Sequence, residues 1–548
     1  MIICGLKLTH DSSVALIDNG QLMFLIELEK INNNNRFKIL EDLSEIEEIL
    51  NSQGYALKDV DRFVIDGWVG MKEKHLSLSN QNESIQLPVA PYHESGLDKN
   101  LMQRYTYDSL PIGNTSLAYS SYMHSANHLT SSYCTSPFSK KQEAAYILIW
   151  DGGMYPRLYF FDPKTKTNKN LGPLFFMGVN IYSIFAQHFG PFKINENVIK
   201  DELSIAGKVM AYAAHGKTNP SILVDLEQTY QATYEDAIKQ ESIPNYPYSF
   251  TKFFRNLIKE KYYYDEDIIS SFHSFLEQKL IQGLKEKTGS DSERPNLCLG
   301  GGAALNIKWN SSIRRSGIFK EVWVCPVPND SGSALGAACS ELLLQTDKVS
   351  LEWNIFKGPN LQASDLMPGW SAQKCDLPAL AELLHASQEP VIFLEDRAAL
   401  GPRALGHRSI LASPQKKEMK SILNTIKIRE PYRPIAPICL EEKAVAIFDP
   451  GTPDPYMLFD HKIKPEWLDK IPAVSHLDGT ARVQTVNSKN APKLYQLLSH
   501  FEEISGLPVL CNTSANFKGS GFFPDLFSAS RWGKVNYIWS ADVLYRRI

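Results

Sequence analysis

Two histidines four residues apart are the first residues of this sequence that suit metal chemistry. His124 and His128 lie in HSANH, within a stretch from Asn114 to Tyr133 that we expect to be helical. A spacing of four puts both imidazoles on one helix face, where a divalent metal can bind them, although two surface histidines on an ordinary helix share that spacing. Asp151 favours the metal, because it ends the buried-type strand QEAAYILIWD just before two glycines. Ligands of α/β folds bind at such strand ends.

A second carboxylate belongs with this group. The segment VWVCPVPNDSGSALG reads as a strand, a polar turn that holds Asp330, and a helix rich in glycine and alanine. Two imidazoles and two carboxylates are a common ligand set for iron, zinc or manganese. The sequence therefore predicts one divalent transition metal bound by His124, His128, Asp151 and Asp330, with the choice of metal left open.

Positive charge is concentrated between Leu400 and Pro437, although the whole chain has a net charge of −4. Paired guanidinium groups suit phosphate or carboxylate, because the planar fork of arginine holds two oxygens at once. The alternative is a solvated basic face, which would not need the glycines and prolines found at the ends of the basic runs. The candidate anion-binding residues of this stretch are Arg403, Arg408, Lys427, Arg429 and Arg433.

Glycine-rich and polar turns add candidate nucleotide contacts. NLCLGGGAALN reads as a strand, a glycine turn and a helix start, which lets backbone amides approach a phosphate. Tight turns use glycine as well, and the polar turn in CNTSAN is either a triphosphate or ribose contact or an ordinary Asx turn. The candidates in these turns and in the small-residue segment GKVMAYAAHG are Gly207, Lys208, Gly301, Gly302, Asn306, Asn512 and Ser514.

Bulk composition sets the class of protein. A chain of 548 residues exceeds what one hydrophobic core normally serves, so we expect two domains. The net charge of −4 gives no reason to expect nucleic acid or an anionic membrane as a partner. Eight scattered cysteines indicate reduced thiols in a cytoplasmic protein. We see no signal peptide and no apolar run of membrane-spanning length.

The chain alternates strands and helices, which predicts an α/β fold. Met1 to Lys30 reads as three strands, and Asn19-Gly20 is a hairpin turn between the second and third. The polar loop between the first two strands holds His10 and Asp11 and is similar to the phosphate loop of actin-like ATPases. The pattern weakens between about Ser350 and Lys374, where we place the domain boundary. The stretch from Val69 to Pro111 reads as an insertion or a loop-rich cover.

Taken together and in this order, these pieces resemble the ATP-dependent O-carbamoyltransferases of natural-product and nodulation-factor pathways. The resemblance rests on GLKLTHDSSVAL, HSANH, DGG after a strand, GKVMAYAAHG, GGGAALN, VPNDSGSALGAA, GPRALGHRSIL, KIREPYRPIAP and NTSAN. It implies a Kae1-like, actin-like ATPase domain over residues 1–350, a linker over 351–375 and a YrdC-like α/β domain over 376–548. Each motif alone is modest evidence, whereas their co-linear occurrence is specific.

The resemblance also implies an activity. The second domain would use ATP, with Mg²⁺, and carbamoyl phosphate to form carbamoyladenylate, and the first would pass the carbamoyl group to a small-molecule hydroxyl and release AMP. It carries the family's metal ligands onto the four residues named above, and a histidine near the acceptor onto His10, which we expect to be catalytic together with Asp11. The family's anion-binding residues carry over onto Arg403, Lys427, Arg433, Arg482 and Ser514. Homodimer formation is left open.

Three departures from the family pattern accompany these matches: KINNNNRF replaces an arginine-rich segment, Ala211 replaces a usual glycine, and GSGFFPD follows NTSAN. Three other functions are weighed against carbamoyl transfer. An actin-like kinase or ATPase would release ADP, a tRNA threonylcarbamoyl enzyme would need a strongly basic surface, and an inactive scaffold would not need the metal set. The acceptor is not readable, and we expect its pocket to include the irregular stretch between Val69 and Pro111.

Overall fold

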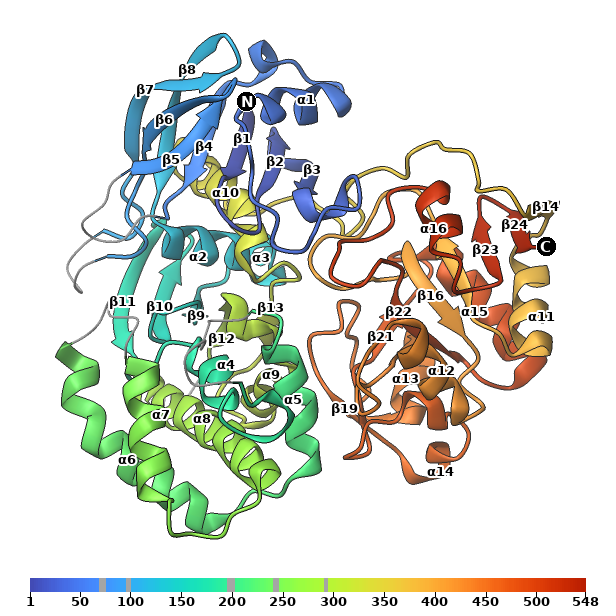
Figure 1. The fold of residues 1–548 in the computed structure, drawn as a ribbon. Helices are drawn as coiled ribbons and strands as arrows, with labels where there is room; N and C mark the ends of the chain where they lie inside the picture. Colours follow the sequence, from blue (N-terminus) through green and yellow to red (C-terminus); the bar gives the residue numbers. More distant parts are fainter. Residues whose placement is uncertain (69–74, 95–99, 195–202, 240–245, 290–293) are drawn as a thin grey trace.

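The structure is a computed structural model that describes residues 1–548 apart from 69–74, 95–99, 195–202, 240–245 and 290–293. Two bodies follow each other along the chain, and each holds its own central sheet or sheets (Figure 1). The first body runs from blue to yellow and the second from orange to red. No helix of the described residues is long and apolar enough to cross a membrane.

The first sheet begins with the predicted three strands. The hairpin at Asn19-Gly20 is confirmed, and both residues have the positive φ that a tight two-residue turn requires (47° and 84°). The sheet order is β3-β2-β1-β4-β8-β7, in which β1, β2 and β3 are antiparallel neighbours and β4 and β8 run parallel to β1. The strands are β1 (Ile2–Lys7), β2 (Ser13–Asp18), β3 (Gln21–Glu27), β4 (Arg62–Asp66), β7 (Tyr105–Ile112) and β8 (Thr115–Tyr122).

The second sheet repeats this topology. Its order is β11-β10-β9-β12-β13, with β9, β10 and β11 antiparallel and β12 and β13 parallel to β9. This duplication confirms the predicted α/β class and is the arrangement expected of an actin-like domain. The strands are β9 (Ala145–Ile149), β10 (Arg157–Asp162), β11 (Thr167–Pro173), β12 (Asn296–Gly300) and β13 (Val322–Val324).

Two helices, α2 (His124–Cys134) and α10 (Ser333–Gln345), pack against each other between the sheets (Figure 1). Small residues allow this close approach. A Cβ at Gly336 would collide with the carbonyl oxygen of Asn127, and one at Gly5 would collide with that of Ala334. The glycine- and alanine-rich sequence after Asp330 therefore serves helix packing, and the packing brings the start of α10 beside α2.

Two expectations about this part of the chain are wrong. The helix expected from Asn114 begins only at His124, because Thr115–Tyr122 forms β8 with aromatic and β-branched residues that suit a half-buried strand. The irregular stretch after Val69 contains a hairpin of β5 (His75–Asn80) and β6 (Glu83–Pro88) as well as β7. Its residues 69–74 and 95–99 lie outside the described part of the chain.

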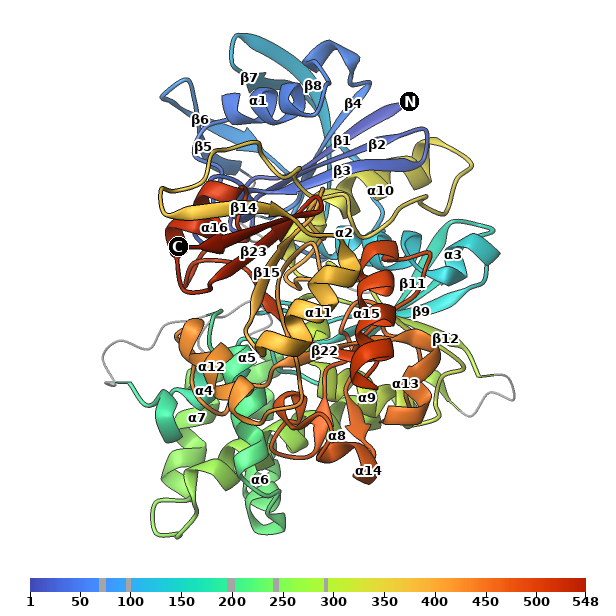
Figure 2. The same cartoon turned by 90° about the vertical axis from the view of Figure 1, so that its right-hand side faces the viewer.

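Helices cover the outer faces of both sheets. α1 (Ser44–Ser52) packs on the first sheet, where Ile46, Ile49 and Leu50 enter its core. A larger helical layer covers the second sheet (Figures 1 and 2). It contains α4 (Ile181–Ala186), α5 (Ala206–Tyr212), α6 (Pro220–Lys239), α7 (Tyr246–Leu257), α8 (Asp265–Thr288) and α9 (Ile307–Arg315), and the short α3 (Pro137–Lys141) follows α2.

The second body is built on one sheet in the order β14-β24-β23-β15-β16-β22-β17-β21. Its strands are β14 (Trp370–Lys374), β15 (Val391–Leu394), β16 (Arg408–Ala412), β17 (Ala436–Leu440), β21 (Gln484–Val486), β22 (Val509–Ser514), β23 (Tyr537–Ser540) and β24 (Val543–Arg547). A small sheet of β18 (Phe448–Asp449), β19 (His461–Ile463) and β20 (Thr480–Ala481) lies beside it. The edge strand β14 falls within the segment expected to be the linker.

The helices of the second body are α11 (Leu377–Ser387), α12 (Glu418–Ile426), α13 (Glu441–Ile447), α14 (Pro465–Leu468), α15 (Pro492–Ser505) and α16 (Leu526–Trp532). α11 and α15 pack side by side (Figure 2). Arg482 lies in the short break between β20 and β21.

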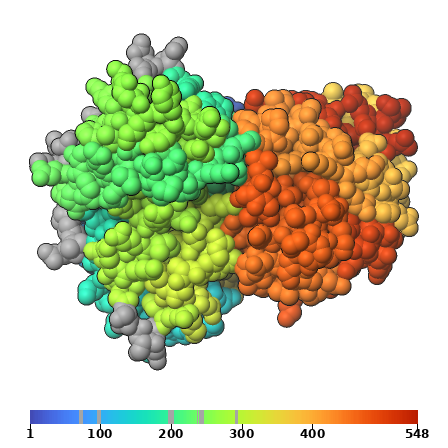
Figure 3. Space-filling model, turned by 90° about the horizontal axis from the view of Figure 1, so that it is seen from below, coloured from blue at the N-terminus to red at the C-terminus, as the bar shows by residue number. Residues whose placement is uncertain are grey.

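The two bodies lie against each other (Figure 3). Lys308 on α9 donates to Asp460 (3.0 Å), Asp478 (2.6 Å) and Thr480 (2.8 Å) of the second body. A second contact is buried: Lys30 donates to the carbonyls of Ala399 and Gly401 (2.7 Å each). These contacts fix the loop that leads to Arg403 against the first domain.

Candidate functional site

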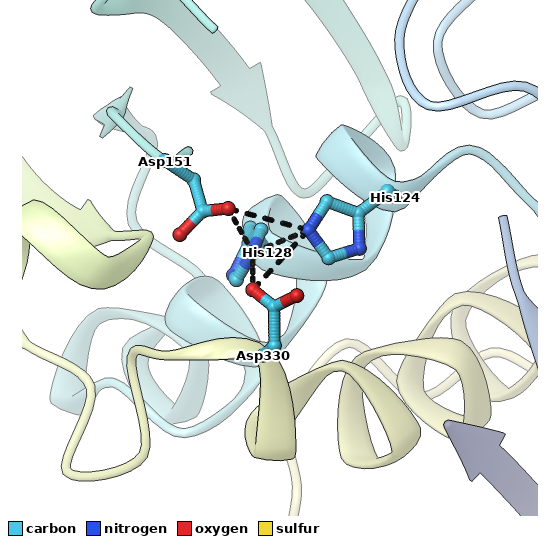
Figure 4. A group of neighbouring side chains, drawn as sticks. All are labelled: His124, His128, Asp151 and Asp330. Carbon is cyan, nitrogen blue, oxygen red and sulfur yellow. Dashed lines mark hydrogen bonds and ion pairs between the residues drawn. The ribbon is translucent and has the colours of Figure 1, made fainter. Parts of the chain in front are cut away.

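The four predicted metal ligands converge on one buried point between the two sheets (Figure 4). His124 Nε2 lies 3.5 Å from Asp151 Oδ2 and 3.5 Å from Asp330 Oδ1. His128 Nε2 lies 3.9 Å and 3.6 Å from the same two oxygens. With bonds of about 2.0–2.1 Å, the ligand atoms of a tetrahedral metal stand ~3.3 Å apart. The donor set and its spacing therefore fit a divalent metal.

The fold explains why these residues meet. His124 and His128 are one turn apart on α2, Asp151 follows β9, and Asp330 opens the turn before α10. Gly301, in the predicted glycine turn, has a φ of 85°, and a Cβ there would lie 2.5 Å from the carbonyl oxygen of Trp150. That turn also carries the backbone N–H of Gly302, which donates to Asp151 Oδ1 (2.6 Å).

A second layer of charge orients the ligands. His124 Nδ1 is 2.8 Å from Asp66 Oδ2, so Nδ1–H donates there and leaves the Nε2 lone pair for the metal. Asn127 Nδ2 donates to the other oxygen of Asp66 (2.7 Å). The buried Lys7 ammonium lies 3.0 Å from Asp66 and 3.2 Å from Asp330. Burial would raise the pKa of Asp330, but the nearby Lys7 ammonium keeps this pKa well below its usual range.

His10 and Asp11 lie at the edge of this cluster, in the loop between β1 and β2. His10 Nε2 is 3.2 Å from Asp330 Oδ2, and its ring meets Trp68 edge-on at 4.6 Å. Burial lowers the pKa of His10, with Asp330 acting in the opposite direction. Burial, Asp330 and Glu29 raise the pKa of Asp11 to about 8.

Most of the predicted anion-binding residues converge in the second domain. Burial lowers the pKa of Arg403, Lys427, Arg429 and Arg482, and repulsion from neighbouring cations lowers each pKa further. Within the described residues, the buried Nε atoms of Arg403 and Arg482 have no hydrogen-bond partner. Few carboxylates balance them: Glu430 pairs with Arg433 at 3.7 Å, and Asp454 acts on Arg403 and Arg482. We call Arg36, Arg403, Lys427, Arg429, Arg433 and Arg482 the basic cluster.

Other candidates of the second domain surround this cluster. Lys427 Nζ donates to the carbonyls of Ser514 (2.8 Å) and Asn516 (3.0 Å), and Arg429 reaches Ser514 Oγ at 3.5 Å. Asn512 donates to Ala404 O (3.0 Å). Arg408 differs, because it is 2% exposed and donates to three backbone carbonyls.

Two predicted nucleotide contacts of the first domain differ in position. One faces the second domain, and the other lies in a turn of the first domain. Lys208 forms a 3.3 Å ion pair with Glu430, beside the exposed Gly207 on α5. Asn306 caps α9, where its side chain accepts from the backbone N–H groups of Lys308 and Trp309. The predicted glycine turn of Gly301 and Gly302 lies at the metal cluster, because Gly302 N–H donates to Asp151.

Comparison with known proteins now bears on the chain. A family model for the carbamoyltransferase N-terminus matches residues 2–339, and one for the carbamoyltransferase C-terminus matches residues 381–539. The chain belongs to the carbamoyltransferase family. This carbamoyltransferase is 44% identical to nodulation protein U of Rhizobium tropici, over 100% of this chain and 96% of that protein. It is 29% identical to the 3'-hydroxymethylcephem-O-carbamoyltransferase of Streptomyces clavuligerus, over 100% of this chain and 99% of that protein.

Sequence reasoning missed four residues around the two sites of this carbamoyltransferase. Asp66 ends a buried strand, the same signal that identified Asp151, and could have been found in that way. Lys7 and Tyr92 carry no comparable signal. Arg36 lies in the departing segment KINNNNRF, yet its backbone N–H donates to Gly519 O (2.9 Å), and its charge lowers the pKa of four members of the basic cluster.

Proposed function

We propose that the protein is an ATP-dependent O-carbamoyltransferase that uses carbamoyl phosphate and acts on a small-molecule hydroxyl. One observation carries the proposal: this chain of the family holds two separate buried clusters. One is cationic and has hydrogen-bond donors without partners among the described residues, and the other consists of two histidines and two aspartates. Each cluster suits one half of the reaction. The Streptomyces clavuligerus relative is named for O-carbamoyl transfer to a hydroxymethylcephem, which supports the same function.

The basic cluster would serve adenylation. ATP and carbamoyl phosphate bring several negative charges, and guanidinium donors without partners are suited to bind them. Carbamoyl phosphate, ATP and one water would give carbamoyladenylate, phosphate and pyrophosphate. Arg403 also donates to Leu305 O of the first domain at 3.4 Å, so the cluster adjoins the domain interface.

The metal cluster would serve transfer. A divalent metal, when bound, would stabilise the phosphate of the leaving AMP and lower the pKa of a bound hydroxyl. The acceptor oxygen forms a bond to the carbamoyl carbon while the bond from that carbon to the AMP oxygen breaks. His10 would take the hydroxyl proton, and Asp330, whose Oδ2 lies 3.2 Å from His10 Nε2, would balance the charge that results.

The test is product analysis with purified protein, ATP and Mg²⁺, with and without carbamoyl phosphate. We expect pyrophosphate release that depends on carbamoyl phosphate and is lost in Arg433→Ala. His124→Ala should keep this release and lose carbamoylation of an acceptor. ADP as the sole product, indifferent to carbamoyl phosphate, would replace the proposal by a kinase or ATPase. Equal loss of both steps in His124→Ala would refute the division of labour.

A further inference from the structure

The segment after β6 reaches the metal cluster although no motif marks it. Its residue Tyr92 donates a hydrogen bond from its hydroxyl to Asp151 Oδ2 at 2.9 Å. This is the same carboxylate oxygen that faces both histidines at 3.5 Å and 3.9 Å. Since Gly302 N–H donates to Asp151 Oδ1, each oxygen of that ligand is held by a different donor. Rotation of the carboxylate away from the histidines would break both bonds.

Tyr92 also holds a second ligand. Its ring stacks on the imidazole of His124, with centroids 4.6 Å apart and an interplanar angle of 26°. Its backbone carbonyl accepts from the N–H of Ser125 (3.0 Å), in the first turn of α2. One residue therefore contacts Asp151, His124 and the start of the helix that carries both histidines.

The segment that carries Tyr92 is itself fixed. The buried Glu94, two residues later, accepts from Tyr159 Oη (2.7 Å), Asn170 Nδ2 (2.6 Å) and Ser125 Oγ (3.3 Å). On the other side, a Cβ at Gly152 would lie 3.0 Å from the Tyr92 hydroxyl, so the glycine after Asp151 allows this approach. The second glycine of the DGG motif, Gly153, has open space around its Cβ position.

We propose that Tyr92 is a positioning residue of the metal centre, which sets the orientation of Asp151 and restrains the His124 ring. The inference rests on the proposed metal-dependent transfer. Outer-shell partners of metal ligands typically change metal affinity by about 10–100-fold. We expect the hydroxyl to act on Asp151 and the ring to act on His124, so two substitutions can separate the two contributions.

The experiment uses the full chain stripped of metal and titrated with Co²⁺ in competition with a chelator. Tyr92→Phe should weaken Co²⁺ binding about 10-fold or more and change the visible absorption of the bound ion, because Asp151 is freed to rotate. Tyr92→Leu should weaken binding further. Tyr119→Phe is the matched control, since the Tyr119 hydroxyl donates to Pro88 O (2.6 Å) at the start of the same segment. It should bind Co²⁺ like the wild type.

Pyrophosphate release, measured on the same preparations, should be unchanged in each variant, because the proposed adenylation takes place in the second domain, away from the metal cluster. Wild-type affinity and spectrum in Tyr92→Phe would overturn the inference while leaving the proposed function in place. Equal weakening in Tyr92→Phe and Tyr119→Phe would also overturn it, because a general loosening of the segment would then explain both. A wild type that binds no Co²⁺ would overturn the metal part of the proposed function together with the inference.

Discussion

Two arginines of the second domain should respond in opposite directions to the same substitution. Burial lowers the pKa of Arg482 to about 10, with Arg433 adding repulsion, and its Nε has no hydrogen-bond partner among the described residues. Burial also lowers the pKa of Arg408 to about 10, but Arg408 donates to the carbonyls of Glu395, Asp396 and His407. The first arrangement suits a ligand, whereas the second stabilises the fold.

The magnitudes follow from these environments. A pKa lowered from 12.5 to about 10 corresponds to a cost of about 3 kcal/mol for the charged guanidinium in the folded state. The guanidinium pKa lies above 7 in both the unfolded and the folded protein, so the full cost of burying the charge is present at pH 7. Arg482→Met removes it and should stabilise the ligand-free protein by about 1–3 kcal/mol. Arg408→Met removes a similar cost but also removes three hydrogen bonds from a charged donor to backbone carbonyls, at about 1.5–3 kcal/mol each, and should destabilise by about 3 kcal/mol.

The assay is urea unfolding at pH 7.5, without ligand and with saturating pyrophosphate. A ligand at 100 times its Kd stabilises the folded wild type by ~2.7 kcal/mol, and Arg482→Met should lose most of that gain while its ligand-free stability rises. Arg408→Met, if it folds, should keep the gain. A ligand-free Arg482→Met that is destabilised as much as Arg408→Met would refute the reasoning, because Arg482 would then stabilise the fold rather than await an anion.

Three further predictions test the framework around the sites. The buried side chains of Glu27 and Lys30 form an ion pair. Glu27→Gln should destabilise by about 3–5 kcal/mol because it leaves the Lys30 charge buried without its carboxylate, and urea unfolding should show that Glu27→Gln/Lys30→Met is largely restored. A Glu27→Gln variant as stable as the wild type would contradict this. Burial lowers the pKa of His273 to about 3, so protonation of this histidine in the unfolded chain lowers the free energy of unfolding as pH falls below 6.5. Between pH 7.5 and 5, the free energy of unfolding should fall by ~2 kcal/mol less in His273→Gln than in the wild type. An equal fall in both proteins would contradict this. Gly301→Ala should lower bound metal, measured by elemental analysis, because its Cβ would press on Trp150 O and on Asp151; unchanged metal content would show that the turn adapts.

The convergence of the four proposed metal ligands could be predicted from the sequence, because each one lies at a place that local rules define. His124 and His128 follow the helical period, and Asp151 ends a buried strand. Both signals survive an error in the element boundary, as the late start of α2 shows, because the spacing of four holds wherever the helix begins. The duplicated sheet could be anticipated only from the family resemblance, since strand order depends on contacts far apart in sequence.

The partners of the ligands could not be predicted in this way. Tyr92 and Lys7 act through packing between segments that are tens of residues apart, and neither has a period or a turn that marks it. Arg36 joins the basic cluster only because its loop pairs with residues near Gly519 of the other domain. Arg408 shows the converse: its place in a basic run predicted a ligand contact, yet its donors are directed at backbone carbonyls.

The metal cluster and the basic cluster differ in the source of the charge that balances their own side chains. At the metal cluster the protein supplies the balancing charge, since Lys7 pairs with Asp66 and Asp330 and Asp66 binds His124. These contacts orient the ligand atoms toward the proposed metal position. In the basic cluster the described residues leave donors without partners, and we propose that substrate phosphates supply the missing charge. Anion binding should therefore tighten the second domain and the loop from Gly401 to Arg403 that rests on the first domain. Because that loop contacts both domains, we expect the proposed adenylation site to be complete only when the domains are docked.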